Sequence, residues 1–161
     1  MEIKRYGAKE FLAAGKLCIR ENEIHIWCIC WPEMTDFWVN HEYILSGQES
    51  EQVGRFRFSE DRMRYIAGKV VVRLLLKRYL DVETIDFSVS ERGKPYHKKI
   101  AGKQTVDFNI SHSGEFILAG FAVGMDIGVD VQEMAGCPDY REIAGNFYTE
   151  EEAEDVIKEG A

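Results

Sequence analysis

The sequence predicts an α+β fold in which a strand and helices precede a meander of short strands. Residues 24–31 alternate and are rich in β-forming side chains, which is typical of a strand. Residues 59–80 carry apolar side chains at three- and four-residue spacing, which indicates an amphipathic helix. Residues 85–132 contain four short alternating segments separated by turns. The order of these elements favours the α+β class.

The first predicted strand is followed by a short helix at residues 46–54, which begins at its N-terminal serine. The strand also contains His25, Cys28 and Cys30, residue types that can bind a metal. Alternation places the histidine opposite the two cysteines on an apolar strand. We therefore favour packing roles for these three side chains over a metal site.

The longer helix has an N-terminal signature, because Ser59 can cap it and Glu60 and Asp61 suit its positive first turn. The buried stripe that its spacing predicts comprises Met63, Ile66, Ala67, Val70, Val71, Leu74 and Leu75. The remaining surface is basic through Arg62, Arg64, Lys69, Arg73 and Lys77. We expect this helix to end near residues 79–81.

The later elements are short. The predicted strands are residues 85–90, 106–110, 115–123 and 126–132. Turns separate them at residues 92–95, 111–114 and 124–125. A linker is predicted around Cys137 and Pro138. Thr149 and Glu152 have the spacing of a capping box and start a last helix.

Length and composition fit one ordinary domain or two small lobes. Of the 161 residues, 45% are hydrophobic and 12% aromatic, so the chain can bury a core. No apolar run reaches the roughly 20 residues that span a bilayer, and we expect no signal peptide. Four cysteines without a Cys-x-x-Cys pair, with no export signal, predict a cytoplasmic location.

The charge is unevenly distributed along the chain. The net charge is −8, yet residues 55–103 hold 13 Lys and Arg against 6 Asp and Glu. This middle region can attract phosphate groups, or it can be an ordinary solvated helix face. The overall acidity argues against general nucleic-acid binding.

Two clusters of residues are candidates for binding phosphate. Gly93-Lys94-Pro95 fixes a turn that presents a lysine charge, although an exposed turn lysine is the simpler interpretation. The segment 108–114 is an apolar strand that ends in hydroxyls, an imidazole and a glycine, which suit phosphate oxygens. A polar hairpin loop is the alternative. A hydrolase triad is disfavoured, because neither serine lies in a G-x-S-x-G elbow.

A third cluster, residues 126–132, predicts a strand with one acidic face. Alternation places Asp126, Gly128, Asp130 and Gln132 on that face, and three β-branched side chains on the other. Hard oxygen ligands suit Mg²⁺, which often shares them with a phosphate. The alternative is an edge strand with one wet face. Sugar kinases and RNase H-like enzymes also carry a D-x-G-x-D strand, but they need further strands and acidic positions.

In this order and spacing, the three clusters closely resemble the surfactin-synthetase-activating type of 4'-phosphopantetheinyl transferase. Upstream, residues 55–58 and 60–64 also resemble the stretch before that family's long helix. The resemblance covers roughly residues 24–157. It implies two similar α+β lobes related by a pseudo-twofold axis, with coenzyme A in the cleft between them. In this sequence the lobes correspond to residues 1–124 and, in part, 125–161.

The resemblance also implies a reaction. A serine of an acyl or peptidyl carrier protein attacks the β-phosphate of coenzyme A, magnesium neutralises the pyrophosphate, and 3',5'-ADP leaves. Asp130 matches the leading metal ligand and a catalytic residue. Gln132 lies at a second metal position, and His112 matches a catalytic residue near the 3'-phosphate. The matched coenzyme A contacts are Arg64, Lys94, Ser111 and His112. No membrane or nucleic-acid partner is implied.

Three departures from the family pattern qualify this expectation. Gln132 stands where many members carry a carboxylate, and residues 48–52 are acidic where members often carry lysines. The family's W-x-x-K-E-x-x-x-K block is absent, and Lys158-Glu159 resembles it only superficially. We therefore expect a chain truncated before that block, which self-associates or pairs with a partner through an exposed apolar lobe surface.

Two other functions stay open at this point. The chain can be a catalytically incomplete remnant that binds coenzyme A or a carrier protein without transfer. It can also be an unrelated magnesium-dependent nucleotide-binding protein that shares only the D-x-G-x-D pattern.

Overall fold

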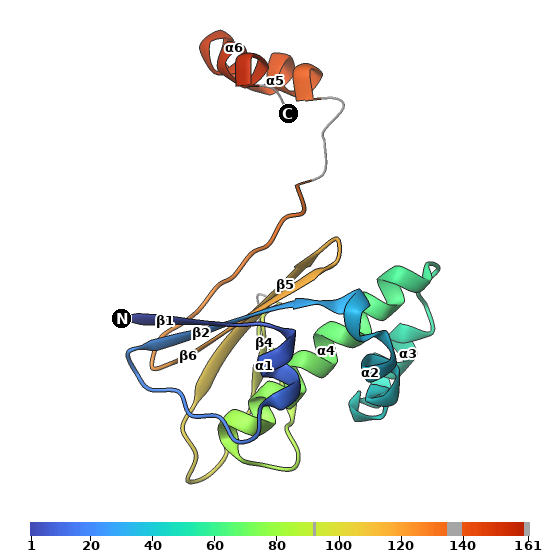
Figure 1. The fold of residues 1–161 in the computed structure, drawn as a ribbon, viewed down its shortest axis with the longest axis vertical. Coiled ribbons are helices and arrows are strands. Elements are labelled where there is room, and N and C mark those ends of the chain that lie inside the picture. The colour runs from blue at the N-terminus through green and yellow to red at the C-terminus, as the bar shows by residue number, and fades with distance from the viewer. Residues whose placement is uncertain (92, 135–139, 160–161) are drawn as a thin grey trace.

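A computed structural model describes residues 1–91, 93–134 and 140–159 of the chain (Figure 1). A four-stranded sheet has the order β1-β2-β6-β5, formed by β1 (Glu2–Tyr6), β2 (Glu23–Cys30), β5 (Val106–Ser113) and β6 (Phe116–Val123). β1 runs parallel to β2, and the other neighbours are antiparallel. β3 (Phe87–Val89) and β4 (Pro95–His97) form a separate hairpin. The mixed α+β class predicted from the sequence is confirmed.

The helix α4 (Ser59–Leu80) packs across one face of the four-stranded sheet and forms the centre of the core (Figure 1). Its Ile66, Val70 and Leu75 are fully buried as predicted, whereas Met63 and Leu74 of the predicted stripe are only half-buried. The buried surface is wider than that stripe, because Val72, Leu76, Tyr79 and Leu80 are buried as well. Ser59 is the first helical residue rather than its cap, since no side chain caps this N-terminus. The predicted capping role of Ser59 is therefore wrong.

Shorter helices complete this part of the fold. They are α1 (Ala8–Ala13), η1 (Trp31–Met34), α2 (Thr35–Asn40), η2 (Glu42–Ile44) and α3 (Gly47–Val53). Of these, α2, η2 and α3 contact α4. Ser46 caps α3 in a capping box with Glu49, which confirms the helix start predicted at that serine. Phe11, Trp27 and Trp38 are fully buried between these helices and the sheet.

A buried polar network joins β2 to α4. The Tyr79 hydroxyl lies 2.8 Å from His25 Nδ1 and accepts a hydrogen bond from Trp27 Nε1 at 3.0 Å. Glu23 lies 3.3 Å from His25 Nε2 and pairs with Lys4 at 2.6 Å. Burial lowers the pKa of His25, and the Lys4 hydrogen bond lowers the pKa of Glu23 to about 2. His25 is buried while Cys28 is exposed, as alternation predicted.

The region after β3 departs from the sequence prediction in three ways. β4 follows the turn directly, and β5 extends through the hydroxyl-rich residues to Ser113. Residues 126–132 are extended but join no sheet, so the predicted fourth strand is wrong. Their backbone amides bond to side chains instead, as described below. The predicted linker around Cys137 and Pro138 lies outside the described residues.

Two helices follow, α5 (Tyr140–Phe147) and α6 (Glu150–Glu159), and they pack against each other. Thr149 and Glu152 form the predicted capping box: the Thr149 amide donates to Glu152 Oε2 at 3.0 Å, and the Glu152 amide donates to Thr149 Oγ1 at 3.4 Å. Lys158 and Glu159, weighed above as a substitute for the family's lysine–glutamate block, end this helix. Across the described ranges, no helix is both long and apolar enough to cross a membrane.

Candidate functional site

The edge strand β5 separates two different polar environments. Val106, Phe108 and Ile110 lie on the α4 side, and the Ile110 side chain reaches Gly68 of α4. Because successive side chains of a strand point to opposite faces, the residues at 107, 109, 111 and 113 lie on the other side. The predicted site residues His112 and Ser111 therefore fall on opposite faces of β5. They can serve one ligand only near the free edge of this strand.

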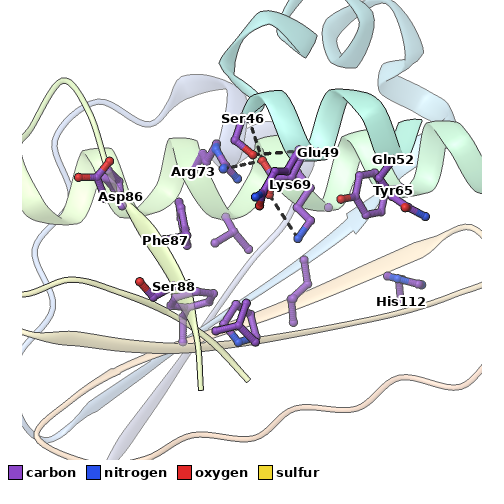
Figure 2. Close-up of a pocket in the computed structure, with 18 residues that line it drawn as sticks. Ser46, Glu49, Gln52, Tyr65, Lys69, Arg73, Asp86, Phe87, Ser88 and His112 are labelled. Atoms are coloured by element: carbon purple, nitrogen blue, oxygen red, sulfur yellow. Dashed lines mark hydrogen bonds and ion pairs between the residues drawn. The ribbon is translucent and has the colours of Figure 1, made fainter. Parts of the chain in front are cut away.

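A cavity of about 650 Å³ lies on the α4 side, between α3, α4, β3 and β5 (Figure 2). Phe87, Phe108 and Ile110 supply apolar lining, and Ser46 and Gln52 supply polar groups from the α3 side. His112 lines the cavity at the end of β5. Apolar walls with a few polar groups are typical of a small-molecule site.

Three charged side chains form an ion cluster in this cavity. Glu49 Oε2 lies 2.6 Å from Arg73 NH2, and Glu49 Oε1 lies 3.4 Å from Lys69 Nζ. The Arg73 guanidinium stacks over the Phe87 ring at 4.5 Å. Burial alone would raise the pKa of Glu49, but the Ser46 amide and the two cations outweigh it and hold that pKa below its usual range. Glu49 is therefore an anion fixed at the centre of the cavity's positive charge.

On the opposite face of β5, four side chains hold residues 127–133 beside the sheet (Figure 1). Each accepts a hydrogen bond from a backbone amide of that segment, always with an offset of 20 residues. The pairs are Asp107 with Ile127 at 2.9 Å, Asn109 with Val129 at 3.0 Å, Ser111 with Val131 at 3.2 Å, and Ser113 with Glu133 at 3.0 Å. We call this set the side-chain ladder. It satisfies amides that backbone pairing satisfies in an ordinary strand.

Two glycines make room for the ladder segment. A Cβ atom at Gly120 of β6 would lie 2.6 Å from Val129 Cγ1 and 2.8 Å from Ile127 Cδ1. At Gly114 a Cβ atom would collide with the Glu133 carboxylate, and the φ of +53° there favours glycine as well. The β-branched residues of the segment consequently pack closely on the sheet. Asp126, Gly128, Asp130 and Gln132 are exposed, which confirms the predicted alternation.

Ser111 joins the ladder to the acidic face. Its hydroxyl donates to Asp130 Oδ1 at 2.7 Å and accepts from the Val131 amide at 3.2 Å. Both hydrogen-bonding capacities of the hydroxyl are thus directed at adjacent residues of the segment. Ser111 fixes the position of the Asp130 carboxylate relative to the sheet.

Lys94 contacts the beginning of the same segment. Its ammonium group donates to Asp107 Oδ2 at 2.9 Å and to the Ile127 carbonyl at 3.2 Å. Asp107 also accepts from the Ile127 amide, so one carboxylate binds both the lysine and the segment. Lys94, which the family resemblance implied as a coenzyme A contact, therefore anchors the ladder in this structure.

Arg64 lies near the other end of β5, at the β5–β6 turn. Its Nε donates to the Gly114 carbonyl at 3.0 Å, and its NH1 pairs with Asp61 at 3.1 Å. Trp31 Nε1 donates to the same carbonyl at 3.1 Å. This contact places the predicted basic residue beside the turn that follows His112 and Ser113.

The donor set for a metal is small. No group of three or more His, Cys, Asp or Glu side chains suited to a metal occurs within residues 1–91, 93–134 and 140–159. Asp130 and Gln132 lie two residues apart on one exposed face of an extended segment. Magnesium is commonly bound by one or two carboxylates together with waters and phosphate oxygens. The chemistry of this pair fits a magnesium ion shared with a phosphate.

Sequence reasoning singled out the polar residues 111–113 and the segment 126–132 but missed most of the cavity. Lys69 and Arg73 were predicted only as part of a basic helix face, and Phe87 was predicted only as part of a strand. The acidity of residues 48–52 was the one sequence signal for a carboxylate in this cavity, because Glu49 lies within that stretch. No spacing in the sequence indicated that Glu49 pairs with Lys69 and Arg73, which lie near the middle of α4.

Comparisons with known proteins give one family match and several relatives. Residues 30–122 match the family described as "4'-phosphopantetheinyl transferase, N-terminal". The chain is 29% identical over 140 residues to the 4'-phosphopantetheinyl transferase HetI of Nostoc, which covers 86% of the chain and 59% of the relative. It is 35% identical over 115 residues to Sfp of Bacillus subtilis, which covers 70% and 49%. The rat L-aminoadipate-semialdehyde dehydrogenase-phosphopantetheinyl transferase is 24% identical over 142 residues. The chain spans about half the length of these curated relatives.

Proposed function

The chain belongs to the 4'-phosphopantetheinyl transferases, and we propose that it binds coenzyme A at the free edge of β5 and takes part in transferring phosphopantetheine to a serine of an acyl or peptidyl carrier protein. One observation carries the proposal. A nucleotide-sized cavity and an oxygen-rich exposed segment flank the same edge strand. A single extended ligand along that edge can contact both.

We assign the nucleotide end of coenzyme A to the cavity. The Phe87 ring and the Ile110 side chain offer apolar surface for a base, and Lys69 and Arg73 supply positive charge. His112 stands at the end of the cavity nearest the β5–β6 turn, where its imidazole suits a phosphate. Arg64 of α4 donates to the Gly114 carbonyl of that turn and adds a cation there.

We assign the pyrophosphate to the exposed face of the ladder segment. Asp130 and Gln132 would hold magnesium, which when bound neutralises charge on the phosphates. Ser111 orients the Asp130 carboxylate through its 2.7 Å hydrogen bond. Lys94 holds the start of the segment through Asp107 and the Ile127 carbonyl. The contribution of these side chains is positioning, which dominates catalysis of phosphoryl transfer.

In the proposed reaction the serine oxygen of the carrier protein forms a bond to the β-phosphorus of coenzyme A. The bond from that phosphorus to the departing oxygen of 3',5'-ADP breaks, and the serine proton passes to a base. Binding without transfer is the second candidate. Gln132 favours it, because an amide on the metal face carries no charge and holds magnesium more weakly than a carboxylate does.

Mass spectrometry of an apo carrier protein incubated with this chain, coenzyme A and Mg²⁺ tests the proposal. We expect the carrier to gain one phosphopantetheine. Asp130→Asn should slow that gain by roughly 10²-fold or more, because charge stabilisation is a large catalytic term. Asp126→Asn is the matched control, since Asp126 lies on the same exposed face about 13 Å earlier along the extended segment.

The outcomes separate the two candidates. Gain of mass that Asp130→Asn abolishes and Asp126→Asn retains supports transfer. No gain of mass, with coenzyme A binding measured by calorimetry, supports binding without transfer. Failure of the chain to bind coenzyme A in the presence or absence of Mg²⁺ contradicts both.

A further inference from the structure

Glu49 occupies an unusual position for a site that is to receive phosphate. Its carboxylate lies 2.6 Å from Arg73 and 3.4 Å from Lys69, and both cations line the cavity (Figure 2). The side chains of Glu49 and Arg73 are only 15% and 11% exposed. Ion pairs with so little solvent around them are screened weakly. The Glu49 carboxylate therefore neutralises the positive charge of Lys69 and Arg73 that would otherwise attract an incoming anion.

The start of α3 holds this carboxylate in place. Glu49 is the third residue of α3, and its Oε2 accepts the Ser46 backbone amide at 2.9 Å. The Glu49 amide in turn donates to Ser46 Oγ at 3.3 Å. This capping box fixes the side chain by short-range geometry, so the carboxylate faces α4 without a large loss of rotamer entropy on pairing.

The formal charges of the cavity lining cancel. Glu49 and Asp86 supply two negative charges, and Lys69 and Arg73 supply two positive charges. A phosphate that enters beside Glu49 meets a neutral site that contains a nearby carboxylate. A phosphate that replaces the Glu49 carboxylate gains both cations. The energetic outcome thus depends on whether this one side chain moves aside.

We propose that Glu49 is a specificity-determining residue of the cavity: it is a resident counterion that occupies the anion position between Lys69 and Arg73, and a ligand's phosphate binds there only by displacing it. This inference rests on the proposed function, because it concerns the same nucleotide cavity. It implies that the phosphates of a nucleotide add little to the affinity of its nucleoside for the cavity while Glu49 is present. It also implies that the contribution of Lys69 and Arg73 to ligand affinity depends on whether Glu49 is paired with them.

Calorimetric titration with 3',5'-ADP and with adenosine at low salt tests the inference. Glu49→Gln removes the charge but keeps an oxygen for the capping box. We expect this variant to bind 3',5'-ADP about tenfold more tightly, or about 1.4 kcal/mol, and to bind adenosine unchanged. Raising the salt concentration should shrink the gain. Glu51→Gln is the matched control, because Glu51 is exposed on the same helix and should change affinity less than twofold.

A double-mutant cycle that combines Lys69→Gln with Glu49→Gln supplies a second readout. It measures the interaction between the two side chains in 3',5'-ADP binding and so does not rest on a single variant. Lys69 is 35% exposed, so its loss should be tolerated by the fold. In the presence of Glu49, Lys69→Gln should weaken 3',5'-ADP binding about twofold. In the Glu49→Gln background the same substitution should weaken it about tenfold, because the lysine then contacts the phosphate directly. Thermal unfolding of each variant shows whether it is folded at the temperature of titration.

The inference is overturned if folded Glu49→Gln binds 3',5'-ADP no more tightly than the wild type, or if the effects of Lys69→Gln are equal in the two backgrounds. The proposed function fails separately. In that case neither the wild type nor any variant binds 3',5'-ADP or coenzyme A, and the inference falls with it.

Discussion

The two faces of β5 are stabilised in different ways. On the α4 side, Phe108 is 2% exposed within a continuous apolar core, and the charges of the cavity pair with one another. On the opposite side, residues 127–133 are held by individual hydrogen bonds from side chains, with close packing at Gly120. The first face is stabilised by many van der Waals contacts within the core, and the second by a few individual hydrogen bonds.

This difference bears on how the proposed site works. The cavity belongs to the cooperative core and should keep its shape as long as the domain is folded. The ladder segment carries Asp130 and Gln132, and side-chain hydrogen bonds hold it in place of backbone pairing. We therefore expect a substitution on the α4 side of β5 to lower the stability of the whole domain. A substitution on the ladder side should affect mainly residues 127–133.

The largest expected effect comes from the core face. Phe108→Ala should lower the free energy of unfolding by about 3–5 kcal/mol, because it removes a buried aromatic ring and leaves a cavity. Urea denaturation measures this change. Phe116→Ala on the same hairpin is the control, since Phe116 is 42% exposed and should cost far less. Equal losses for the two variants would contradict the contrast between buried and exposed sites.

A smaller effect is expected from acidification, and it should act on the core face. The pKa of buried His25 lies below its usual value of 6.5, so the folded state binds fewer protons than the unfolded state just below that pH. The stability due to neutral His25 is complete above pH 6.5 and is lost as pH falls through the folded pKa. The loss should be at most about 1.4 kcal/mol per pH unit. The lowered pKa of Glu23 adds a further loss between pH 4.5 and about 2.

Urea denaturation from pH 8 to pH 5 measures this dependence. His25→Gln should flatten the profile in that range. A profile for His25→Gln with the wild-type slope would show that another group is responsible.

The smallest expected effect on global stability comes from the ladder face. Asn109→Ala removes the acceptor of the Val129 amide, at a cost of about 1 kcal/mol. The change should be local: amide hydrogen exchange should speed up at residues 127–133 by about fivefold and remain unchanged in α4. Asn40→Ala, on an exposed residue at the end of α2, is the control. Equal acceleration in α4 and in the segment would contradict the separation of the two faces.

Much of the framework could be predicted from the sequence. The spacing of apolar residues located α4, and the serine and threonine caps located the starts of α3 and α6. Alternation gave the correct exposed face of residues 126–132, because that pattern depends only on an extended backbone. Local rules were sufficient wherever the structure is determined by neighbours in the chain.

The arrangement of the site could not be predicted in the same way. The ladder pairs residues that are 20 positions apart through side chains of β5, so propensity for a strand at 126–132 led to the wrong expectation of backbone pairing. Ser111 and His112 are adjacent in sequence and were predicted to act together, but a strand places them on opposite faces. The Glu49 cluster depends on how α3 packs on α4. Roles of these residues toward coenzyme A, magnesium and a carrier protein stay predictions, as does self-association.

The central claim is that both faces of β5 serve one coenzyme A molecule. Hydrogen exchange of the chain with and without coenzyme A and Mg²⁺ tests it most directly, because each face has its own reporter amides. We expect coenzyme A to slow exchange both in α3 and the middle of α4 and in residues 127–133, with the second effect reduced when Mg²⁺ is omitted. Protection confined to one face, or absent from both at saturating ligand, would contradict the account.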